Sequence, residues 1–263
     1  MSSILVLSDL HLCKWLSNVS DVSQLRTLWR GFDELILNGD TEETYSSRNS
    51  VKSKMATAKL IKIAEDDGLK VRILNGNHDP MISDNHYYSS HNDTVLIFHG
   101  HAIFPEVAPW TWYGKTIASH RRKLINELGD SFESQLLATQ LASEKSASGG
   151  KNKNKPTRLT LPIRVVWCVH RILRAWKDFP KLSADWIASY APTSKFVVVG
   201  HTHRAGIWEI DGRVYINMGC FGFPSHPLAV VIENNTLRCF RVLKKNNSFY
   251  LGQDLGSWQL EAL

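Results

Sequence analysis

Five short apolar runs punctuate the sequence, and each of them ends in residues whose side chains carry oxygen or imidazole nitrogen. The runs are rich in Leu, Val, Ile and Phe, and they lie at 4–7, 34–37, 71–74, 95–98 and 195–199. Runs of this length and composition predict buried β-strands. Longer stretches of mixed polarity separate the early runs, so the chain has the strand and helix alternation that is typical of α/β folds.

One helix and four further strands are predicted outside these runs. The helix is expected over 51–67, where apolar residues recur at helical spacing: Met55, Ala58, Leu60, Ile61 and Ala64. The strands are expected at 207–210, 214–217, 228–232 and 237–242, because apolar and β-branched residues dominate each stretch. The predicted strands therefore occupy the two ends of the chain and leave the middle to a different kind of segment.

The segment 105–190 differs from its surroundings in both composition and pattern. It carries 14 Lys and Arg against 7 Asp and Glu, a net charge of +7, so the rest of the chain is close to neutral. It also holds five of the nine tryptophans, and its pattern is helical. We therefore expect a core formed by 1–104 plus 191–263, with 105–190 as a helical, basic, Trp-rich cap inserted into it.

Two features are predicted within the cap. The stretch 146–156 is made of small and polar residues with almost nothing to bury, which predicts a mobile loop. Pro162 suits the first turn of a helix that is expected to run to about Asp178. On a helical projection this helix is amphipathic and basic. Its apolar side holds Val165, Val166, Val169, Ile172, Leu173 and Trp176, and its other side holds Arg164, Arg171 and Arg174.

Composition narrows the class of protein. A hydrophobic content of 43% with 21% charged residues indicates a folded globular chain. No stretch approaches the roughly 20 apolar residues of a membrane span, and the start of the chain lacks the pattern of a secretory signal. The four cysteines are scattered without paired spacing. We expect a cytoplasmic protein, with peripheral membrane contact through the cap as an alternative, and an anionic partner because the net charge is +6.

The residues that follow the five runs form a set suited to divalent metal ions. Its members are Asp9, His11, Asp40, Asn77, His99, His201 and His203. The carboxyl ends of such strands meet at one edge of a sheet, so these side chains can converge. Asp40 offers two oxygens and can bridge two ions about 3.5–4 Å apart. The mixture of imidazole and carboxylate predicts manganese, with iron, zinc or nickel as alternatives, ahead of calcium or magnesium.

The order and spacing of these residues resemble the calcineurin-like metallophosphoesterases. The matching motifs are Ser8-Asp9-Leu10-His11, Gly39-Asp40, Gly76-Asn77-His78-Asp79, His99-Gly100-His101 and Gly200-His201-Thr202-His203. The resemblance covers roughly 1–104 and 194–233 and leaves the cap unexplained. It implies an α/β (α+β) fold, a four-layer α-β-β-α sandwich in which two mixed β-sheets are flanked by helices.

The resemblance also implies roles for individual residues. One ion would be held by Asp9, His11, Asp40 and His203, and the other by Asp40, Asn77, His99 and His201. His78 lies outside both sets and would protonate the leaving oxygen or steady the phosphoryl group, which suits imidazole. Glu43 is the expected acid that orients His78, with Asp79 as the second candidate. The implied reaction is in-line attack of metal-activated water on phosphorus, without a phosphoenzyme intermediate.

Several other residues near these motifs are not assigned to the metal site. His120, Arg121 and Arg122 form a basic run that could bind substrate phosphate, although a solvated helix face has the same composition. His101 is left out of the metal set. Cys220 lies in a Gly-containing turn similar to the one that closes the site in this family, and no nucleophilic role is assigned to it.

Several classes of substrate are compatible with the sequence. A helical cap after the His99 motif resembles the UDP-2,3-diacylglucosamine diphosphatases of lipid A synthesis, but His78 and His101 stand where that family carries Arg and Asp. A basic cap could instead track a nucleic-acid backbone, as in a nuclease. A non-catalytic scaffold, like the retromer subunit of the superfamily, usually lacks the catalytic histidine or some ligands, and this chain has both. The expected activity is hydrolysis of a phosphomonoester, phosphodiester or pyrophosphate.

Overall fold

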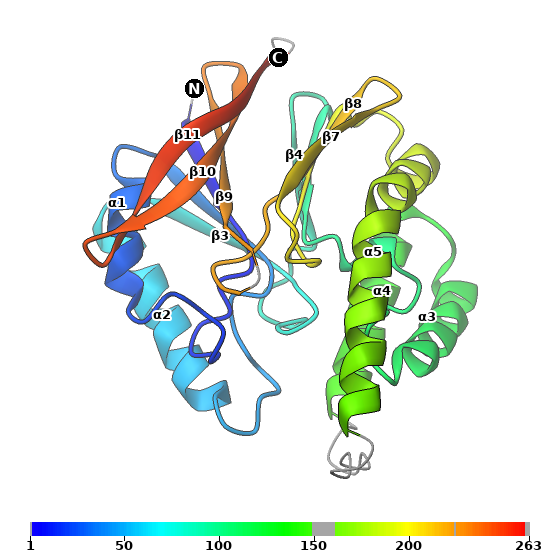
Figure 1. The fold of residues 1–263 in the computed structure, drawn as a ribbon. Coiled ribbons are helices and arrows are strands. Elements are labelled where there is room, and N and C mark those ends of the chain that lie inside the picture. Colours follow the sequence, from blue (N-terminus) through cyan, green and yellow to red (C-terminus); the bar gives the residue numbers. More distant parts are fainter. Residues whose placement is uncertain (1, 149–160, 224, 261–263) are drawn as a thin grey trace. The chain divides into compact units, whose positions relative to one another are not determined.

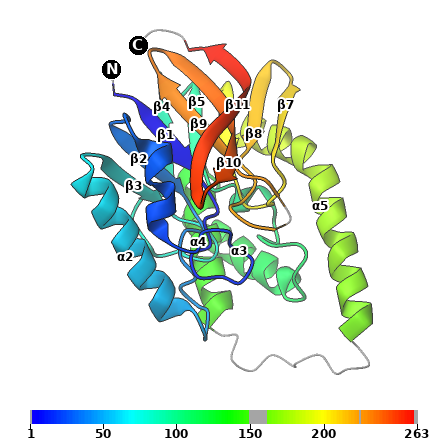
Figure 2. The same cartoon turned by 60° about the vertical axis from the view of Figure 1, so that its left-hand side comes forward.

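The computed structural model describes residues 2–148, 161–223 and 225–260, and the chain divides into two compact units. Unit 1 comprises Met1–His99 and Thr193–Leu263, and unit 2 comprises Gly100–Pro192. The boundaries expected from the sequence lie after 104 and after 190. The strands and the long helix α2 (Ser50–Asp66) belong to unit 1, and three long helices belong to unit 2 (Figures 1 and 2): α3 (Gly114–Leu128), α4 (Phe132–Ser148) and α5 (Leu161–Tyr190).

Unit 1 contains two mixed β-sheets. The first has the spatial order β11 (Ser248–Gln259), β10 (Thr236–Lys245), β9 (Leu228–Glu233), β1 (Ile4–Leu7), β2 (Glu34–Asn38) and β3 (Lys70–Leu74). The second has the order β4 (Tyr87–Ser90), β5 (Val95–Phe98), β6 (Phe196–Val199), β8 (Arg213–Asn217) and β7 (Gly206–Ile210). β1, β2 and β3 are parallel, as are β5, β6 and β8, and the other pairs are antiparallel. The predicted pair of mixed sheets is confirmed.

Alternating side chains give the first sheet two buried faces. On β1, Leu5 and Leu7 pack with the helices, whereas Ile4 and Val6 pack among residues of the second sheet. The helical side is formed by η1 (Val22–Leu25), α1 (Arg26–Trp29) and α2 (Ser50–Asp66). Figure 1 shows α1 and α2 along one side of this sheet. Because the strand is apolar on both faces, it removes apolar area from water in two layers at once.

The helix predicted over 51–67 forms as α2, but its buried face is rotated from the predicted one. Met55 is 68% exposed and Ala58 is also exposed, whereas Ser53, Leu60 and Ala64 are buried. The hydroxyl oxygen of Ser53 accepts a hydrogen bond of 3.0 Å from the backbone N–H of Glu43. This hydrogen bond, which a pattern of apolar residues cannot predict, selects the side of the helix that faces the sheet.

All nine predicted strands form, and two strands that the sequence pattern does not predict complete the sheets. β4 is short and half polar, and β11 contains Gly252 and Gly256 within its length. β4 pairs with β5, and β11 pairs with β10 along most of that strand. Tertiary pairing therefore supplies what local preference does not, as is common for strands.

Unit 2 has a small core of its own. It begins with η2 (His101–Ile103), and His101 is buried there. Val107, Ile117 and Ala142 form a buried cluster that joins α3 to α4. Residues 146–148 of the predicted loop belong instead to α4, and 149–156 lie outside the described residues.

α5 extends to Tyr190, well beyond its predicted end near Asp178, although Pro180 lies inside it. Phe179, Trp186 and Ile187 are buried in this second half of the helix. Their burial outweighs the loss of one N–H donor at the proline, so the helix continues. Among the described residues, no helix is both long enough and apolar enough to cross a membrane.

Candidate metal centre

The predicted ligands follow the ends of five strands of unit 1. Asp9 and His11 come after β1, Asp40 after β2 and Asn77 after β3, all in the first sheet. In the second sheet, His99 follows β5, and His201 and His203 follow β6. Parallel strands bring their carboxyl ends to the same edge of a sheet. His203 of the second sheet contacts Asp9 and His11 of the first sheet, so the loops of the two sheets meet.

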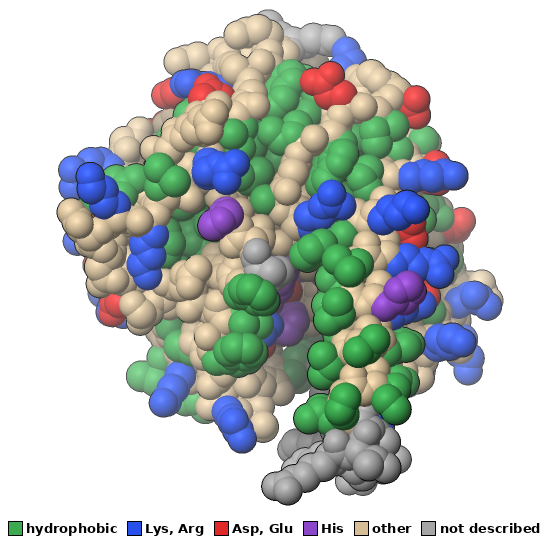
Figure 3. Space-filling model, viewed as in Figure 1, with side chains coloured by type: hydrophobic (Ala, Val, Ile, Leu, Met, Phe, Trp, Pro, Cys, Tyr) green, Lys and Arg blue, Asp and Glu red, His purple; other side chains and the backbone are tan. Residues whose placement is uncertain are grey.

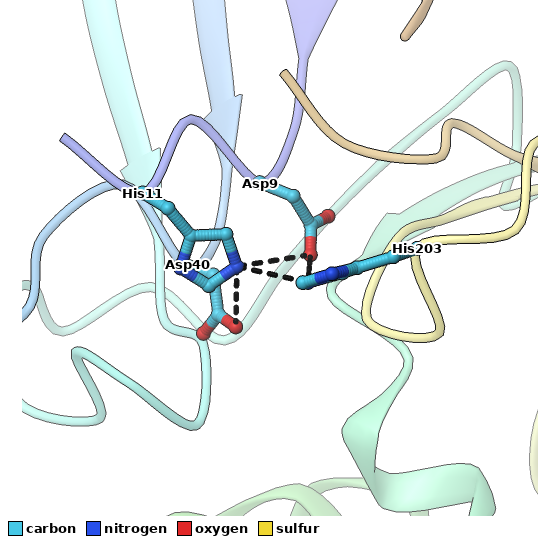
Figure 4. A group of neighbouring side chains, drawn as sticks. All are labelled: Asp9, His11, Asp40 and His203. Atoms are coloured by element: carbon cyan, nitrogen blue, oxygen red, sulfur yellow. Dashed lines mark hydrogen bonds and ion pairs between the residues drawn. The ribbon is translucent and has the colours of Figure 1, made fainter. Parts of the chain in front are cut away.

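Asp9, His11, Asp40 and His203 form a cluster in which one donor atom of each residue lies within 4.8 Å of the others (Figure 4). The Nε2 atoms of His11 and His203 are 2.9 Å apart. A carboxylate oxygen of Asp9 lies 3.3 Å from Nε2 of His203, and one of Asp40 lies 3.6 Å from Nε2 of His11. Two imidazoles and two carboxylates directed at one place suit a divalent ion, which its ligand atoms approach to about 2.0–2.2 Å.

Burial and charge shift the ionisation of this cluster in opposite directions. Burial lowers the pKa of His11 to about 4, against the opposing hydrogen bond with Glu43. Burial also disfavours the charged form of His203, but its contacts with Asp9 and Cys220 together outweigh burial and raise the pKa of His203 to about 10. Burial raises the pKa of Asp9, but His99 and His203 together lower it by a larger amount. The pKa of Asp9 therefore lies below its ordinary value. The carboxylates thus stay ionised and draw positive charge into the cluster.

Asp40 connects this cluster to the remaining histidines. Its Oδ1 lies 3.4 Å from Nε2 of His99, while its Oδ2 lies 3.6 Å from Nε2 of His11. The other ring nitrogen of His99, Nδ1, lies 3.0 Å from the backbone carbonyl oxygen of Asn38 and can donate to it, which directs Nε2 towards Asp40. The rings of His99 and His201 are 5.3 Å apart between centroids. The two oxygens of Asp40 therefore face two different histidines.

Asn77 supplies an oxygen that no described donor satisfies. Its side-chain Oδ1 is buried and, among the residues that the structure describes, has no hydrogen-bond partner. Leaving a buried acceptor unsatisfied costs about 1–3 kcal/mol. A cation at this oxygen would remove that cost, so the environment of Asn77 fits its expected role as a ligand.

The backbone at the ligands adopts an uncommon conformation. Five of the seven predicted ligands have positive φ angles, between 45° and 69°: Asp9, His11, Asp40, His201 and His203. Residues other than glycine rarely occupy this region, and such residues gather at functional sites. The conformation therefore marks these loops as a site without reference to their side chains.

Two glycines allow the loops to approach the ligands closely. A Cβ atom on Gly200 would lie 2.0 Å from Oδ2 of Asp9, and one on Gly76 would lie 2.3 Å from Oδ1 of Asp40. Neither glycine has a positive φ angle, so an alanine could adopt either backbone. These two motif positions require glycine because of space, since any side chain would displace a ligand oxygen.

Glu43 connects His11 to His78. Its Oε1 lies 2.7 Å from Nδ1 of His11, and its Oε2 lies 3.0 Å from Nδ1 of His78. The ammonium group of Lys14 lies 3.0 Å from Oε1. Burial raises the pKa of Glu43, but the two histidine hydrogen bonds and Lys14 outweigh burial and hold it well below its usual value. An ionised carboxylate can only accept, so Nδ1 of both rings carries the hydrogen.

Asp79, the second candidate for orienting His78, has other partners. It is fully buried, and its two oxygens accept hydrogen bonds of 2.7–3.0 Å from the backbone N–H groups of Asp40, Thr41, Glu42 and Gly76. Burial and the charge of Asp40 raise the pKa of Asp79 to about 7. Asp79 therefore ties the loop after β2 to the loop after β3, and Glu43 is the carboxylate that contacts His78.

The three basic residues predicted to bind substrate lie on α3 in unit 2. Arg121 is only 5% exposed, and its guanidinium group donates to the carbonyl oxygen of Phe104 at 2.9 Å and to Oε1 of Gln135 at 2.6 Å. Burial lowers the pKa of Arg121 to about 10. Arg122 is exposed and His120 is half-buried. Arg121 thus has a packing role within unit 2, and the substrate-binding prediction is kept for His120 and Arg122.

The site also uses residues that sequence reasoning misses. Lys14 and Ser53 both contact Glu43, one through its carboxylate and the other through its backbone N–H. Neither lies in a recognised motif, so no sequence signal distinguishes them from surface residues. The turn that contains Cys220 lies beside the site, because the N–H of Phe221 donates to the carbonyl oxygen of Asp9 at 3.1 Å.

Comparison with known proteins assigns the chain to a family. The model of the calcineurin-like phosphoesterase superfamily domain matches residues 2–235. Similar solved structures include Yfce, a phosphoesterase from E. coli, with 12% identity over 98% of this chain and 100% of that chain and a TM-score of 0.44. Another is wild-type Vps29 complexed with Zn²⁺ from Entamoeba histolytica, with 11% identity over 97% of this chain and 99% of that chain and a TM-score of 0.46. A search of curated proteins finds no match. Since the family model extends over most of the chain and includes every residue of the cluster, the chain belongs to the calcineurin-like phosphoesterase superfamily.

Proposed function

We propose that this protein is a two-metal-dependent phosphoesterase that hydrolyses a phosphate ester or pyrophosphate by in-line attack of water. The observation that carries the proposal is the position of Asp40, whose two oxygens face His11 and His99. A carboxylate placed between two imidazole groups is arranged to bridge two cations. Membership of the phosphoesterase superfamily supports the reaction class.

The proposed ligands divide into two sets that share Asp40. One set is Asp9, His11, Asp40 and His203, and the other is Asp40, Asn77, His99 and His201. Their nitrogen and oxygen donors suit manganese, iron, zinc or nickel, and we propose manganese. When bound, such ions supply an activated water at neutral pH and positive charge beside the phosphoryl oxygens.

His78 is the proposed general acid. Glu43 accepts the hydrogen of Nδ1, which orients the ring and leaves Nε2 for the substrate. Nε2 lies 4.0 Å from Oδ2 of Asp40, so it is close to the metal ligands without joining the cluster of four. The side chain is 36% exposed and can therefore be reached by a substrate. In its protonated form Nε2 can donate to the leaving oxygen, a contribution of about 10²–10⁴-fold.

The substrate class follows from charge. The segment 105–190 carries a net charge of +7, which favours an anionic, phosphate-containing substrate. We propose to identify it by measuring hydrolysis with added manganese across phosphomonoesters, phosphodiesters, UDP-sugars and single-stranded DNA. A preference for DNA supports a nuclease, whereas a preference for UDP-sugars supports a pyrophosphatase.

The test of the proposed function compares two aspartate variants. Asp40→Ala removes the proposed bridge, whereas Asp66→Ala removes a carboxylate that is 60% exposed on α2 and serves as the matched control. After manganese loading, elemental analysis of wild type and Asp66→Ala should approach two ions per chain. Asp40→Ala should lose at least one of them and should lose hydrolysis of bis(p-nitrophenyl) phosphate.

Three outcomes contradict the proposal in different ways. Wild-type protein that binds no metal refutes the metal centre. Protein that binds two ions but hydrolyses none of the substrates supports a non-catalytic metal-binding scaffold. Equal loss of metal in both variants shows that the loss is not specific to Asp40.

A further inference from the structure

The first half of α5 exposes an apolar face. Figure 3 shows hydrophobic side chains gathered along this helix of unit 2, with Lys and Arg side chains beside them. Six apolar residues there are between 49% and 71% exposed: Leu161, Ile163, Val165, Val166, Val169 and Leu173. Single exposed apolar residues are ordinary on a protein surface, but a contiguous apolar patch indicates an interaction surface.

Five of the six exposed residues share one side of the helix, and Ile163 borders that side next to Val166. Leu161, Val165, Val169 and Leu173 follow each other at intervals of four residues, which places them on one ridge, and Val166 lies beside that ridge. From Leu161 to Arg174 the helix has no buried residue, whereas its second half buries several side chains in unit 2. The second half therefore anchors α5 in unit 2, and the ridge is not needed for that core.

Basic side chains border the ridge. Arg174, Lys177 and Lys181 are exposed on the next turns, and the stretch 161–181 carries five Lys and Arg against one Asp. An apolar ridge with cationic residues beside it is the pattern of helices that lie in the headgroup region of a membrane.

We propose that the apolar face of α5, with its flanking lysines and arginine, docks this protein on an anionic membrane surface. Charge selects this occupant. A second copy of the chain would bring the same net positive stretch against this one, and like charges oppose such a pairing. An anionic bilayer instead offers negative headgroups to Arg174, Lys177 and Lys181 and a hydrocarbon boundary to the ridge. This inference stands independently of the proposed hydrolysis, because docking needs no metal.

The test places negative charges on the exposed apolar face of α5 and compares them with an equal change elsewhere. Ile163→Glu/Val166→Glu alters two residues that are 70% and 71% exposed on α5. The matched control is Val51→Glu/Met55→Glu on α2 of unit 1, where the two residues are 72% and 68% exposed. Full-length wild-type protein should co-sediment with vesicles of phosphatidylcholine and phosphatidylglycerol and should bind weakly to phosphatidylcholine alone. The α5 variant should bind the anionic vesicles at least about tenfold more weakly, whereas the control should bind like wild type.

A second variant tests the basic residues separately from the apolar ridge. Arg174→Gln/Lys177→Gln/Lys181→Gln should weaken binding to the anionic vesicles and reduce its dependence on salt, because screening acts on exposed charges. Both α5 variants should keep wild-type unfolding temperatures and wild-type hydrolysis of a small aryl phosphodiester. Keeping that hydrolysis shows that loss of docking is not loss of the metal centre.

Four results overturn the docking proposal. Wild-type protein that ignores anionic vesicles refutes it directly. Equal weakening by the α5 variant and the α2 control shows a general effect of charge. A fall in unfolding temperature specific to the α5 variant shows that another part of the chain covers the ridge. A wild-type dimer that Ile163→Glu/Val166→Glu converts to monomer, without vesicle binding by either, assigns the ridge to a second copy.

Discussion

Glu43→Gln offers the sharpest test of how the proposed acid and the proposed metal ligands are linked. The variant keeps the shape of the side chain but replaces one accepting oxygen by a donating NH₂ group. In the wild type, Oε1 accepts from His11 and Oε2 accepts from His78. The glutamine can accept from only one ring, and the other ring must present a nitrogen without hydrogen.

Lys14 decides which histidine changes. Its ammonium group lies 3.0 Å from Oε1, and an NH₂ group at that position would place donor against donor. The amide oxygen is therefore expected at the Oε1 position, where it keeps the hydrogen bond with His11 and preserves Nε2 of that ring as a metal ligand. The NH₂ group then faces His78, whose ring must move its hydrogen from Nδ1 to Nε2.

The expected cost follows from the loss of the charged acceptor that orients His78. A hydrogen bond to a charged group contributes about 1.5–3 kcal/mol, and about 1.4 kcal/mol corresponds to a tenfold change in rate. Turnover of an aryl phosphodiester should therefore fall by about 10- to 100-fold, while the manganese content stays at the wild-type level. Metal content by elemental analysis, turnover, and ¹⁵N chemical shifts of the histidine rings measure the three parts of this prediction.

Lys14 provides the matched controls. Lys14→Met alone keeps the carboxylate, so both histidines keep their tautomers and the metal content should not change. Lys14→Met/Glu43→Gln removes the group that orients the amide, so the NH₂ group can also face His11 and the manganese content should fall. Loss of metal in Glu43→Gln alone, or unchanged turnover in that variant, would refute the reasoning.

Further predictions test packing and accessibility. Gly200→Ala should lose its bound manganese, because the new Cβ would lie 2.0 Å from Oδ2 of Asp9. Its turnover should fall at least about 100-fold while its secondary structure is kept. Elemental analysis and circular dichroism check this, and unchanged metal binding would contradict it. Arg121→Met should lower the unfolding temperature in differential scanning calorimetry, since two buried acceptors lose their donor at about 1–3 kcal/mol each; a change confined to the Michaelis constant would contradict the packing role. In native protein at pH 8, a thiol reagent should label the exposed Cys13 rapidly and Cys239 hardly at all, because burial raises the pKa of Cys239 to about 12; equal labelling rates would contradict the burial.

The strands and the residues that follow them can be predicted because both signals are local. The run Ile4–Leu7 and the motif Asp9-Leu10-His11 adjoin in the sequence, and the same holds for the run that ends before His99. Apolar side chains in a row favour a buried strand wherever the segment lies. The chain direction then brings the carboxyl ends of parallel strands together. The two mixed sheets of unit 1 follow that prediction.

The helices show where local pattern fails. The apolar spacing in α2 predicts Met55 on the buried side, but Ser53 is buried instead because its hydroxyl binds the N–H of Glu43. The helix that opens at Pro162 is expected to end near Asp178, but α5 continues because Phe179 and later residues are buried in unit 2. In both cases, contacts with residues outside the helix stabilise a structure that the local sequence pattern does not predict.

The sequence by itself determined which residue types occupy the strand ends and in which order, and it therefore determined the family. Only the tertiary structure decided which of these groups meet. His11 and His203 are 192 positions apart, yet their Nε2 atoms lie 2.9 Å from each other. Glu43 rather than Asp79 contacts His78, and Arg121 is enclosed within unit 2. The physical reason is that burial and hydrogen-bond pairing depend on what the rest of the chain places nearby, whereas strand preference and ligand chemistry belong to the residues themselves.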